Sequence, residues 1–175
     1  MKEQRKNNML KIGLIIFVIL LAIDQISKII AINTDINMTI IDNILNFRLI
    51  FNKGIAFGIG QGQNISTFVI TNLIVLGIII RFIWLQKERI DALTMCSLFI
   101  ILAGGVGNFI DRVFRGQVVD FIETFPKIHF PIFNIADICI VVGWIMIAYT
   151  FARYTYKEVL VKKDERNNNN IGGSN

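Results

Sequence analysis

Two aspartates at the edges of apolar segments are the residues of this sequence best suited to acid–base chemistry. Asp120 lies in the motif VVDF and Asp137 in the motif FNIAD, which leads into a long apolar run. Charged groups next to hydrocarbon are costly and are usually retained for function. Two carboxylates in one site cannot both ionise easily, so one keeps a proton near neutral pH. The ionised one can activate a water while the protonated one polarises a peptide carbonyl, so we predict an aspartic dyad.

The chain between the two aspartates must fold back if they are to meet. They are 17 positions apart, and a continuous helix of that length would separate them by about 25 Å. Pro126 and Pro131 interrupt this stretch and argue against such a helix. We therefore expect a folded connection that brings Asp120 close to Asp137.

Polar residues around the pair are spaced to support it. Asn108, Asp111 and Arg112 are three and four positions apart, so Asn108 faces both others if a helix extends that far. Arg112 would neutralise carboxylate charge or bind a substrate carbonyl. Asn134 precedes Asp137 by one helical turn and is suited to cap the helix that follows. The simpler interpretation, that Asp111 and Arg112 only mark a helix end, stays open.

A second polar group lies near the end of the first apolar segment. Asp24 and Lys28 are four positions apart and share one helix face. They either neutralise one another to ease membrane insertion or support the dyad. Ser27 beside Lys28 also raises the alternative of a serine–lysine peptidase. Adjacent side chains on a helix point about 100° apart, which argues against that pair.

The composition is that of an integral membrane protein. The 175 residues are 54% hydrophobic and 18% charged, with a mean hydropathy of +0.58, whereas soluble domains carry about 25% charged residues. The net charge of +5 comes mainly from the tails and one turn, so we expect no nucleic-acid partner. The single histidine, His129, and two distant cysteines, Cys96 and Cys139, argue against a metal site.

The apolar runs predict an all-α membrane protein with four transmembrane helices and a small extended, β-like platform on the outer face. The expected helices span residues 12–32, 65–85, 92–110 and 134–152.

The segments between and beyond these helices are polar or mixed. The platform spans 33–64, and its side chains expected to face lipid or a lipidated ligand are Phe47, Phe51, Phe57 and Ile59. The other segments are an N-terminal tail, 1–11, a turn, 86–91, an outer loop with Asp120, 111–133, and a disordered Asn-rich tail, 153–175.

The basic residues predict the orientation of the chain. They concentrate in both tails and in the turn that contains Lys87 and Arg89, and the positive-inside rule places these segments in the cytoplasm. The carboxylates at the opposite helix ends then share the outer face; they are Asp24, Asp111, Asp120 and Asp137. A transporter or channel would instead carry polar groups through the full depth of its helices.

Five motifs, in this order, resemble those of bacterial lipoprotein signal peptidase, also called signal peptidase II. They are DQISK from Asp24, FNKGIAF from Phe51, GNFIDR from Gly107, GQVVDFI from Gly116 and FNIAD from Phe133. The resemblance covers nearly the whole chain and implies that Asp120 and Asp137 are the catalytic pair. The supporting residues that it implies are Asp24, Lys28, Asn52, Asn108, Arg112 and Asn134, to which we add Gly54 and Asp111 from the same motifs.

The resemblance also implies the reaction. Such an enzyme removes the signal peptide from a prolipoprotein and cuts just before a cysteine that carries diacylglycerol on its sulfur. It uses no metal and no organic cofactor, and it is inhibited by the cyclic peptide globomycin. We accordingly expect a monomer in the bacterial cytoplasmic membrane, in contact with membrane lipid, with both termini cytoplasmic and the site on the outer face.

Overall fold

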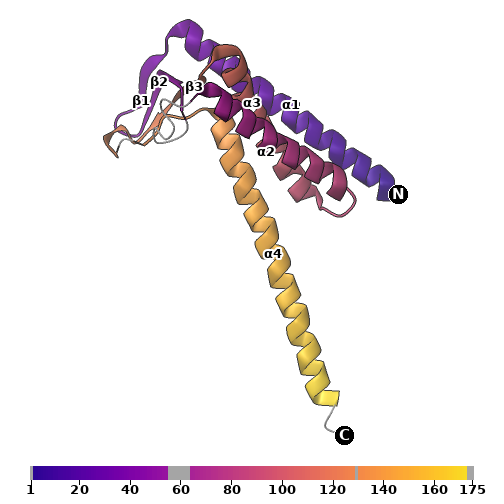
Figure 1. Ribbon diagram of the computed structural model, residues 1–175. Helices are drawn as coiled ribbons and strands as arrows, with labels where there is room; N and C mark the ends of the chain where they lie inside the picture. The colour runs from indigo at the N-terminus through magenta and orange to yellow at the C-terminus, as the bar shows by residue number, and fades with distance from the viewer. Residues whose placement is uncertain (1, 55–63, 129, 173–175) are drawn as a thin grey trace.

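A computed structural model of the chain describes residues 2–54, 64–128 and 130–172, and four of its helices are long and apolar enough to cross a membrane. The spanning helices are α1 (Lys2–Thr34), α2 (Ile65–Gln86), α3 (Ala92–Arg115) and α4 (Ile135–Gly172). The other elements are the strands β1 (Asn37–Ile41), β2 (Leu45–Asn52) and β3 (Val118–Thr124) and a short 3-10 turn, η2 (Pro126–Ile128). The predicted combination of four spanning helices and a small sheet is confirmed (Figure 1).

Helix α3 is the centre of the bundle, because it contacts each of the other three spanning helices. The run GGVG gives it three faces on which a neighbour can approach closely. A Cβ atom at Gly104 would overlap a backbone carbonyl oxygen of α4, and one at Gly105 would press on a leucine of α2. One at Gly107 would collide with the Asp24 carboxylate of α1. Small residues that allow such approach are a main device of helix packing in membranes.

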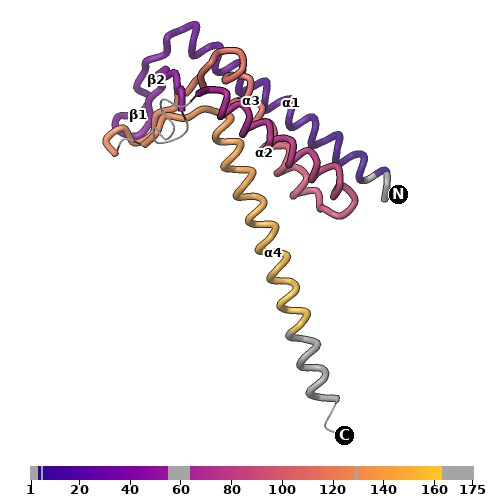
Figure 2. Tube along the Cα trace, viewed as in Figure 1, coloured from indigo at the N-terminus to yellow at the C-terminus, as the bar shows by residue number. Residues whose placement is uncertain are grey.

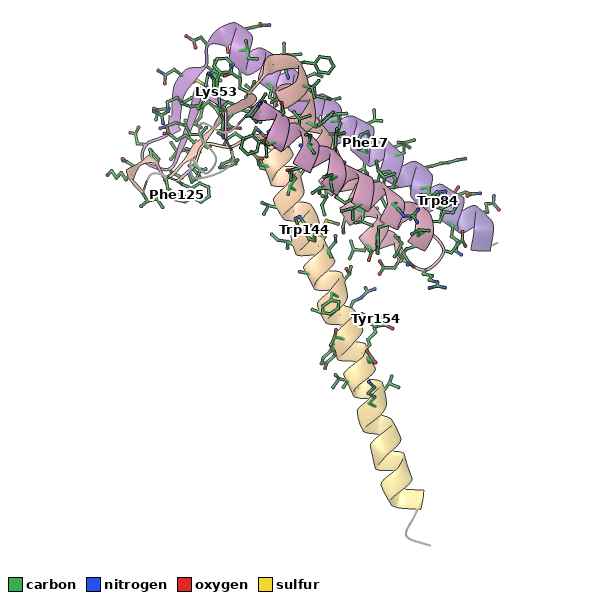
Figure 3. The ribbon with its side chains drawn as sticks, viewed as in Figure 1. Phe17, Lys53, Trp84, Phe125, Trp144 and Tyr154 are labelled. Atoms are coloured by element: carbon green, nitrogen blue, oxygen red, sulfur yellow. The ribbon has the colours of Figure 1, made fainter. Side chains whose placement is uncertain are left out.

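The outward faces of α1, α2 and α4 are apolar. Trp84 on α2 and Trp144 on α4, both labelled in Figure 3, are 65% and 55% exposed. Many isoleucines and leucines on the same helices are about half exposed as well. Surfaces of this size and character are stable against hydrocarbon rather than water.

The sheet lies at one end of the bundle, where α1 ends and α4 begins (Figure 2). Its three strands are antiparallel in the order β1-β2-β3. Gly116, with a φ of 70°, ends α3 in the left-handed conformation that glycine adopts without strain, and it turns the chain into β3. The third strand therefore comes from the stretch that the sequence predicted to be a loop.

Side chains of the predicted lipid-facing platform lie in different environments. Phe51 is 46% exposed, in keeping with contact to lipid. Phe47 is less exposed than Phe51, because its ring packs on Phe121 of β3 with the ring centroids 6.3 Å apart. Phe57 and Ile59 lie outside the described residues.

The helices extend beyond the spans expected from hydropathy. The predicted N-terminal tail is part of α1, because Lys6 pairs with Glu88 in the turn after α2 and Met9 packs on the core of the bundle. Helix α3 runs past residue 110 to Arg115. Its last turn carries Asp111 and Arg112, which are therefore helical residues rather than part of a loop.

Helix α4 differs most from the prediction. It continues to Gly172, so the tail from residue 153 that we predicted to be disordered is helical up to that point. The sequence from Arg153 to Arg166 contains no glycine or proline, and Glu158 and Lys162 form a favourable pair one turn apart. The helix, about 57 Å long from its 38 residues, leaves the bundle as a single rod (Figure 1).

Cysteine labelling tests the orientation of these elements. In a chain whose own Cys96 and Cys139 are replaced, we expect Asp42→Cys, in the exposed turn between β1 and β2, to react with an impermeant thiol reagent on intact cells. Arg89→Cys, in the exposed turn between α2 and α3, is expected to react only after the membrane is opened, because basic turns stay in the cytoplasm. The reverse pattern would contradict the orientation.

Candidate active site

Asp120 and Asp137 are both held by Asn134. Asp120 lies in the middle of β3 and Asp137 in the first turn of α4. The side-chain amide of Asn134 donates to Asp120 Oδ1 at 2.7 Å, and the backbone N–H of Asn134 donates to Asp137 Oδ2 at 3.1 Å. The N–H of Asp137 in turn donates to Asn134 Oδ1 at 3.0 Å. One residue thus caps α4 and binds both carboxyl groups, so the expected fold-back of the chain is present.

Two further asparagines complete the shell around the pair. Asn108 of α3 donates to Asp137 Oδ1 at 2.8 Å, and Asn52 at the end of β2 donates to Asp120 Oδ2 at 2.9 Å. The four oxygens of the two carboxyl groups therefore each accept a hydrogen bond. Because every such oxygen has a second lone pair, both groups keep acceptor capacity for a water or a substrate.

The turn after β2 is shaped around Asn52. The Oδ1 atom of Asn52 accepts the backbone N–H of Gly54 at 2.9 Å, while its Nδ2 atom donates to Asp120. This side chain-to-backbone bond is an Asx turn, which is a common way to close a tight bend. Gly54 therefore fixes the orientation of an amide that binds Asp120.

The pair opens on one cavity of about 620 Å³. Its polar lining comes from β2, β3 and the spanning helices; it consists of Asn52, Asn72, Asn108, Arg112, Asp120 and Asp137. Its apolar lining comes mainly from the β3–α4 connection and from α4; it includes Phe130, Pro131, Ile132, Phe133, Ile138, Ile140, Val141 and Val142. A site of this size and mixture is suited to an amphipathic substrate.

Arg112 brings a cation to the cavity. Its guanidinium donates to the backbone carbonyls of Asn108 at 3.3 Å and Gly54 at 3.4 Å, and it lies 5.8 Å from the ring centroid of Phe68. Among the described residues Arg112 forms no ion pair. Its charge acts at longer range on the carboxylates of Asp137 and Asp120, and it lines the cavity that they share.

A buried ion cluster lies behind the two carboxylates. Lys28 is fully buried, and its Nζ atom lies 2.9 Å from a carboxylate oxygen of Asp24 and 2.9 Å from one of Asp111. Asp24 accepts the backbone N–H of Ala136 at 2.9 Å, and Asp111 accepts that of Val119 at 3.0 Å. Ala136 and Val119 immediately precede Asp137 and Asp120. The cluster therefore fixes the backbone at both members of the pair.

Lys28 also reaches the site directly. Its ammonium donates to Asn108 Oδ1 at 3.1 Å, and the same oxygen accepts from Asn134 Nδ2 at 3.1 Å. Both donors orient the Asn108 amide so that its own Nδ2 faces Asp137. All ten predicted site residues thus lie in or next to one connected network around the cavity.

Sequence reasoning missed two members of this network. Arg115 forms an ion pair with Asp111 and donates to Gln25 Oε1 at 3.0 Å. Gln25 donates to Asp24 Oδ2 at 3.0 Å and to the carbonyl of Gly107 at 3.2 Å. The four-residue spacing of Asp111 and Arg115 was the available signal, but it requires α3 to continue past residue 110.

The contacts of Ser27 exclude the serine–lysine alternative. Its hydroxyl donates to the backbone carbonyl of Asp24 at 2.8 Å within the helix. Lys28 is occupied by two carboxylates and an amide. A general base must be close to its nucleophile, and neither group is available to the other.

The surroundings of Asp120 favour a protonated carboxyl group. Burial raises the pKa of Asp120 from its ordinary value of 3.8 to about 6. The nearby carboxylate of Asp137 contributes to this raised pKa, which is the net result after hydrogen bonds from Asn52 and Asn134 have lowered it.

Comparison with known proteins places the chain in a family. The sequence model of signal peptidase (SPase) II matches residues 16–153. The lipoprotein signal peptidase of Halalkalibacterium halodurans is 38% identical over 131 residues, which cover 74% of this chain and 80% of that protein. The lipoprotein signal peptidase of Shouchella clausii is 41% identical over 132 residues, which cover 74% of this chain and 85% of that protein. A bacterial membrane enzyme solved by the in meso method has a TM-score of 0.74 at 33% identity, covering 83% of this chain and 90% of that one.

Four spanning helices and these matches define a membrane-embedded protease. More narrowly, the chain belongs to the signal peptidase II family.

Removal of the buried cation is expected to destabilise the fold strongly. Lys28→Met leaves the buried carboxylates of Asp24 and Asp111 without the cation between them. We expect the free energy of unfolding to fall by about 3–5 kcal/mol. Thermal unfolding in detergent measures the loss, and Lys162→Met on the exposed part of α4 is the matched control. A change no larger than that of the control would contradict the structural role of Lys28.

The raised pKa of Asp120 predicts a pH-dependent difference in stability. The folded chain keeps this proton up to about pH 6, whereas the unfolded chain, with the ordinary pKa of 3.8, loses it earlier. The wild-type chain therefore loses stability as pH rises through this window, by roughly 3 kcal/mol in total. Asp120→Asn does not titrate, so its unfolding temperature should rise relative to wild type from about pH 4 to pH 7. A difference in unfolding temperature between the two chains that stays constant over this pH range would contradict the raised pKa of Asp120.

Proposed function

We propose that this protein is an aspartic endopeptidase that removes signal peptides from prolipoproteins, cutting before the diacylglyceryl-modified cysteine. The observation that carries the proposal is the Asn134 amide network, which holds Asp120 and Asp137 at one cavity. The names of the relatives from Halalkalibacterium halodurans and Shouchella clausii support the substrate class.

The chemistry follows from a pair that shares one proton. The ionised carboxylate takes a proton from a water, and the resulting hydroxide forms a bond to the carbonyl carbon of the scissile peptide. The protonated carboxyl group donates to the carbonyl oxygen as negative charge develops there. The tetrahedral intermediate then breaks its C–N bond, and the amine leaves with a proton from the pair. The raised pKa of Asp120 near 6 supports retention of the shared proton close to neutral pH.

The other groups of the site hold the substrate and the pair. Asn52, Asn108 and Asn134 fix the orientation of the two carboxyl groups. The guanidinium of Arg112 lines the cavity close to both carboxyl groups, so it is suited to bind a substrate carbonyl. Positioning of this kind is a major part of catalysis, because the reacting groups are already oriented.

The apolar part of the cavity suits the lipid group of the substrate. Ile138, Val141 and Val142 line it from α4, and the outward-facing Val141 and Val142 are 57% and 41% exposed. An acyl chain can therefore bind there while remaining continuous with membrane lipid. A globomycin-like cyclic peptide would compete for the same cavity.

The proposed location is the bacterial cytoplasmic membrane, with both termini in the cytoplasm, the site on the outer face and a single chain as the active unit. The basic turn between α2 and α3 and the sheet at the opposite end of the bundle support this orientation. Family membership as a signal peptidase argues against the transporter alternative.

Amide substitutions in the pair test the proposed chemistry. Asp120→Asn and Asp137→Asn keep the size of each side chain but cannot ionise, so each is expected to lower kcat by about a thousandfold or more. The double variant should be no worse than either single one, because both remove the same proton transfer. Cleavage rates are measured beside thermal unfolding, so that folded protein is compared.

The matched control is Glu123→Gln on the same strand. Glu123 pairs with Arg48 and does not line the cavity, so cleavage should be close to that of wild type. A folded Asp137→Asn chain that cuts at nearly the wild-type rate would overturn the aspartic mechanism.

A further inference from the structure

Helix α2 carries an amide side chain at an unexpected depth. Asn72 lies seven residues after Ile65, or about 10 Å along the helix from its start. Its sequence neighbours Leu73, Ile74 and Val75 are apolar and exposed on the lipid side, whereas Asn72 lines the cavity. Burying a polar group at such depth in a membrane costs free energy unless the group has a hydrogen-bond partner.

Only part of the hydrogen-bonding capacity of this amide is used. Asn72 Nδ2 donates to the backbone carbonyl of Gly105 at 3.3 Å, which is at the long end of the range for such bonds. An amide side chain has two N–H donors and an acceptor oxygen. Among the described residues, neither Asn72 Oδ1 nor the second N–H has a partner. One donor and one acceptor therefore remain next to the cavity.

The position of Asn72 relative to the carboxylate pair follows from α3. Gly105, which contacts Asn72, precedes Asn108 by three residues, a rise of about 4.5 Å. Asn108 donates to Asp137. Asn72 therefore lies about one helical turn closer to the middle of the spans than the pair does.

A substrate peptide has unpaired groups at this level. A peptide bound for hydrolysis must be extended across the two carboxylates, so residues just before the cut lose their helical hydrogen bonds. Each such peptide group offers one N–H and one carbonyl, which match the free acceptor and donor of a side-chain amide. Without a partner, peptide groups in an apolar medium cost several kcal/mol.

We propose that Asn72 binds a backbone peptide group of the signal peptide, within the first three peptide bonds before the cut. This inference rests on the proposed function. It makes Asn72 a substrate-binding residue for the extended, membrane-embedded part of the substrate. Because the contact is with the backbone, it is independent of the side chain at that position of the signal peptide.

The competing explanation is that Asn72 only joins α2 to α3. Amide side chains do stabilise contacts between helices in membranes, and the bond to Gly105 is such a contact. A joining role predicts an effect on stability alone. A binding role predicts an effect that depends on the backbone of the substrate.

The test combines Asn72→Leu with substrates in which a single peptide bond is replaced by an ester. A diacylglyceryl-modified prolipoprotein is prepared with an ester at each of the three positions before the cut in turn, which removes one N–H and weakens one carbonyl. Thr71→Val, a similar polar-to-apolar change at the neighbouring exposed position of α2, is the matched control. Asn72→Ala, which only removes atoms, replaces Asn72→Leu if the latter does not fold.

We expect Asn72→Leu to lower kcat/KM about tenfold, mainly through KM, and Thr71→Val to leave it unchanged. One ester should lower kcat/KM for the wild-type chain but have no further effect on the Asn72 variant. Equal cleavage by Asn72→Leu and wild type, or ester effects of equal size in both, would overturn the inference. A wild-type chain that does not cut the prolipoprotein at all would overturn the proposed function and this inference with it.

Discussion

The fold depends on one buried cation. Lys28 lies between Asp24 and Asp111 where water does not reach it, and charges at such a place are stable only when they are paired and hydrogen-bonded. The pairing needs α1 and α3 in one register, because Asp24 and Lys28 come from α1 and Asp111 from α3. The same carboxylates hold the backbone just before Asp120 and Asp137. The same contacts that neutralise Lys28 therefore also set the positions of Asp120 and Asp137.

Close packing of α1 and α4 against α3 allows these buried polar groups to reach one another. Gly107 leaves room for the Asp24 carboxylate against α3, and Gly104 lets the backbone of α4 approach at the level where α4 begins. A larger side chain at either position would separate the helices that carry the two halves of the network. The packing of a few glycines thus determines whether the polar groups can meet, and it explains why the site lies where three spans converge.

The sequence was sufficient to predict the four spans and most of the polar residues that meet around the cavity, because both depend on local patterns and motifs. It did not predict β3, because a short apolar strand between a helix end and two prolines has the composition of a loop. Nor did it predict the length of α4, where polar residues suggested disorder but local helix propensity is high. Gln25 and Arg115 were missed because their roles depend on contacts between α1 and the last turn of α3, which no local pattern contains.

The central claim, that this chain uses a carboxylate pair to cut a lipid-modified precursor, is tested most directly with the purified protein. A diacylglyceryl-modified prolipoprotein is incubated with it in the presence and absence of a metal chelator, and the products are identified by mass spectrometry. We expect one cut, immediately before the modified cysteine, at the same rate with and without chelator, and none in the unmodified precursor. Loss of cleavage on chelation, or a cut elsewhere in the chain, would contradict the proposed function.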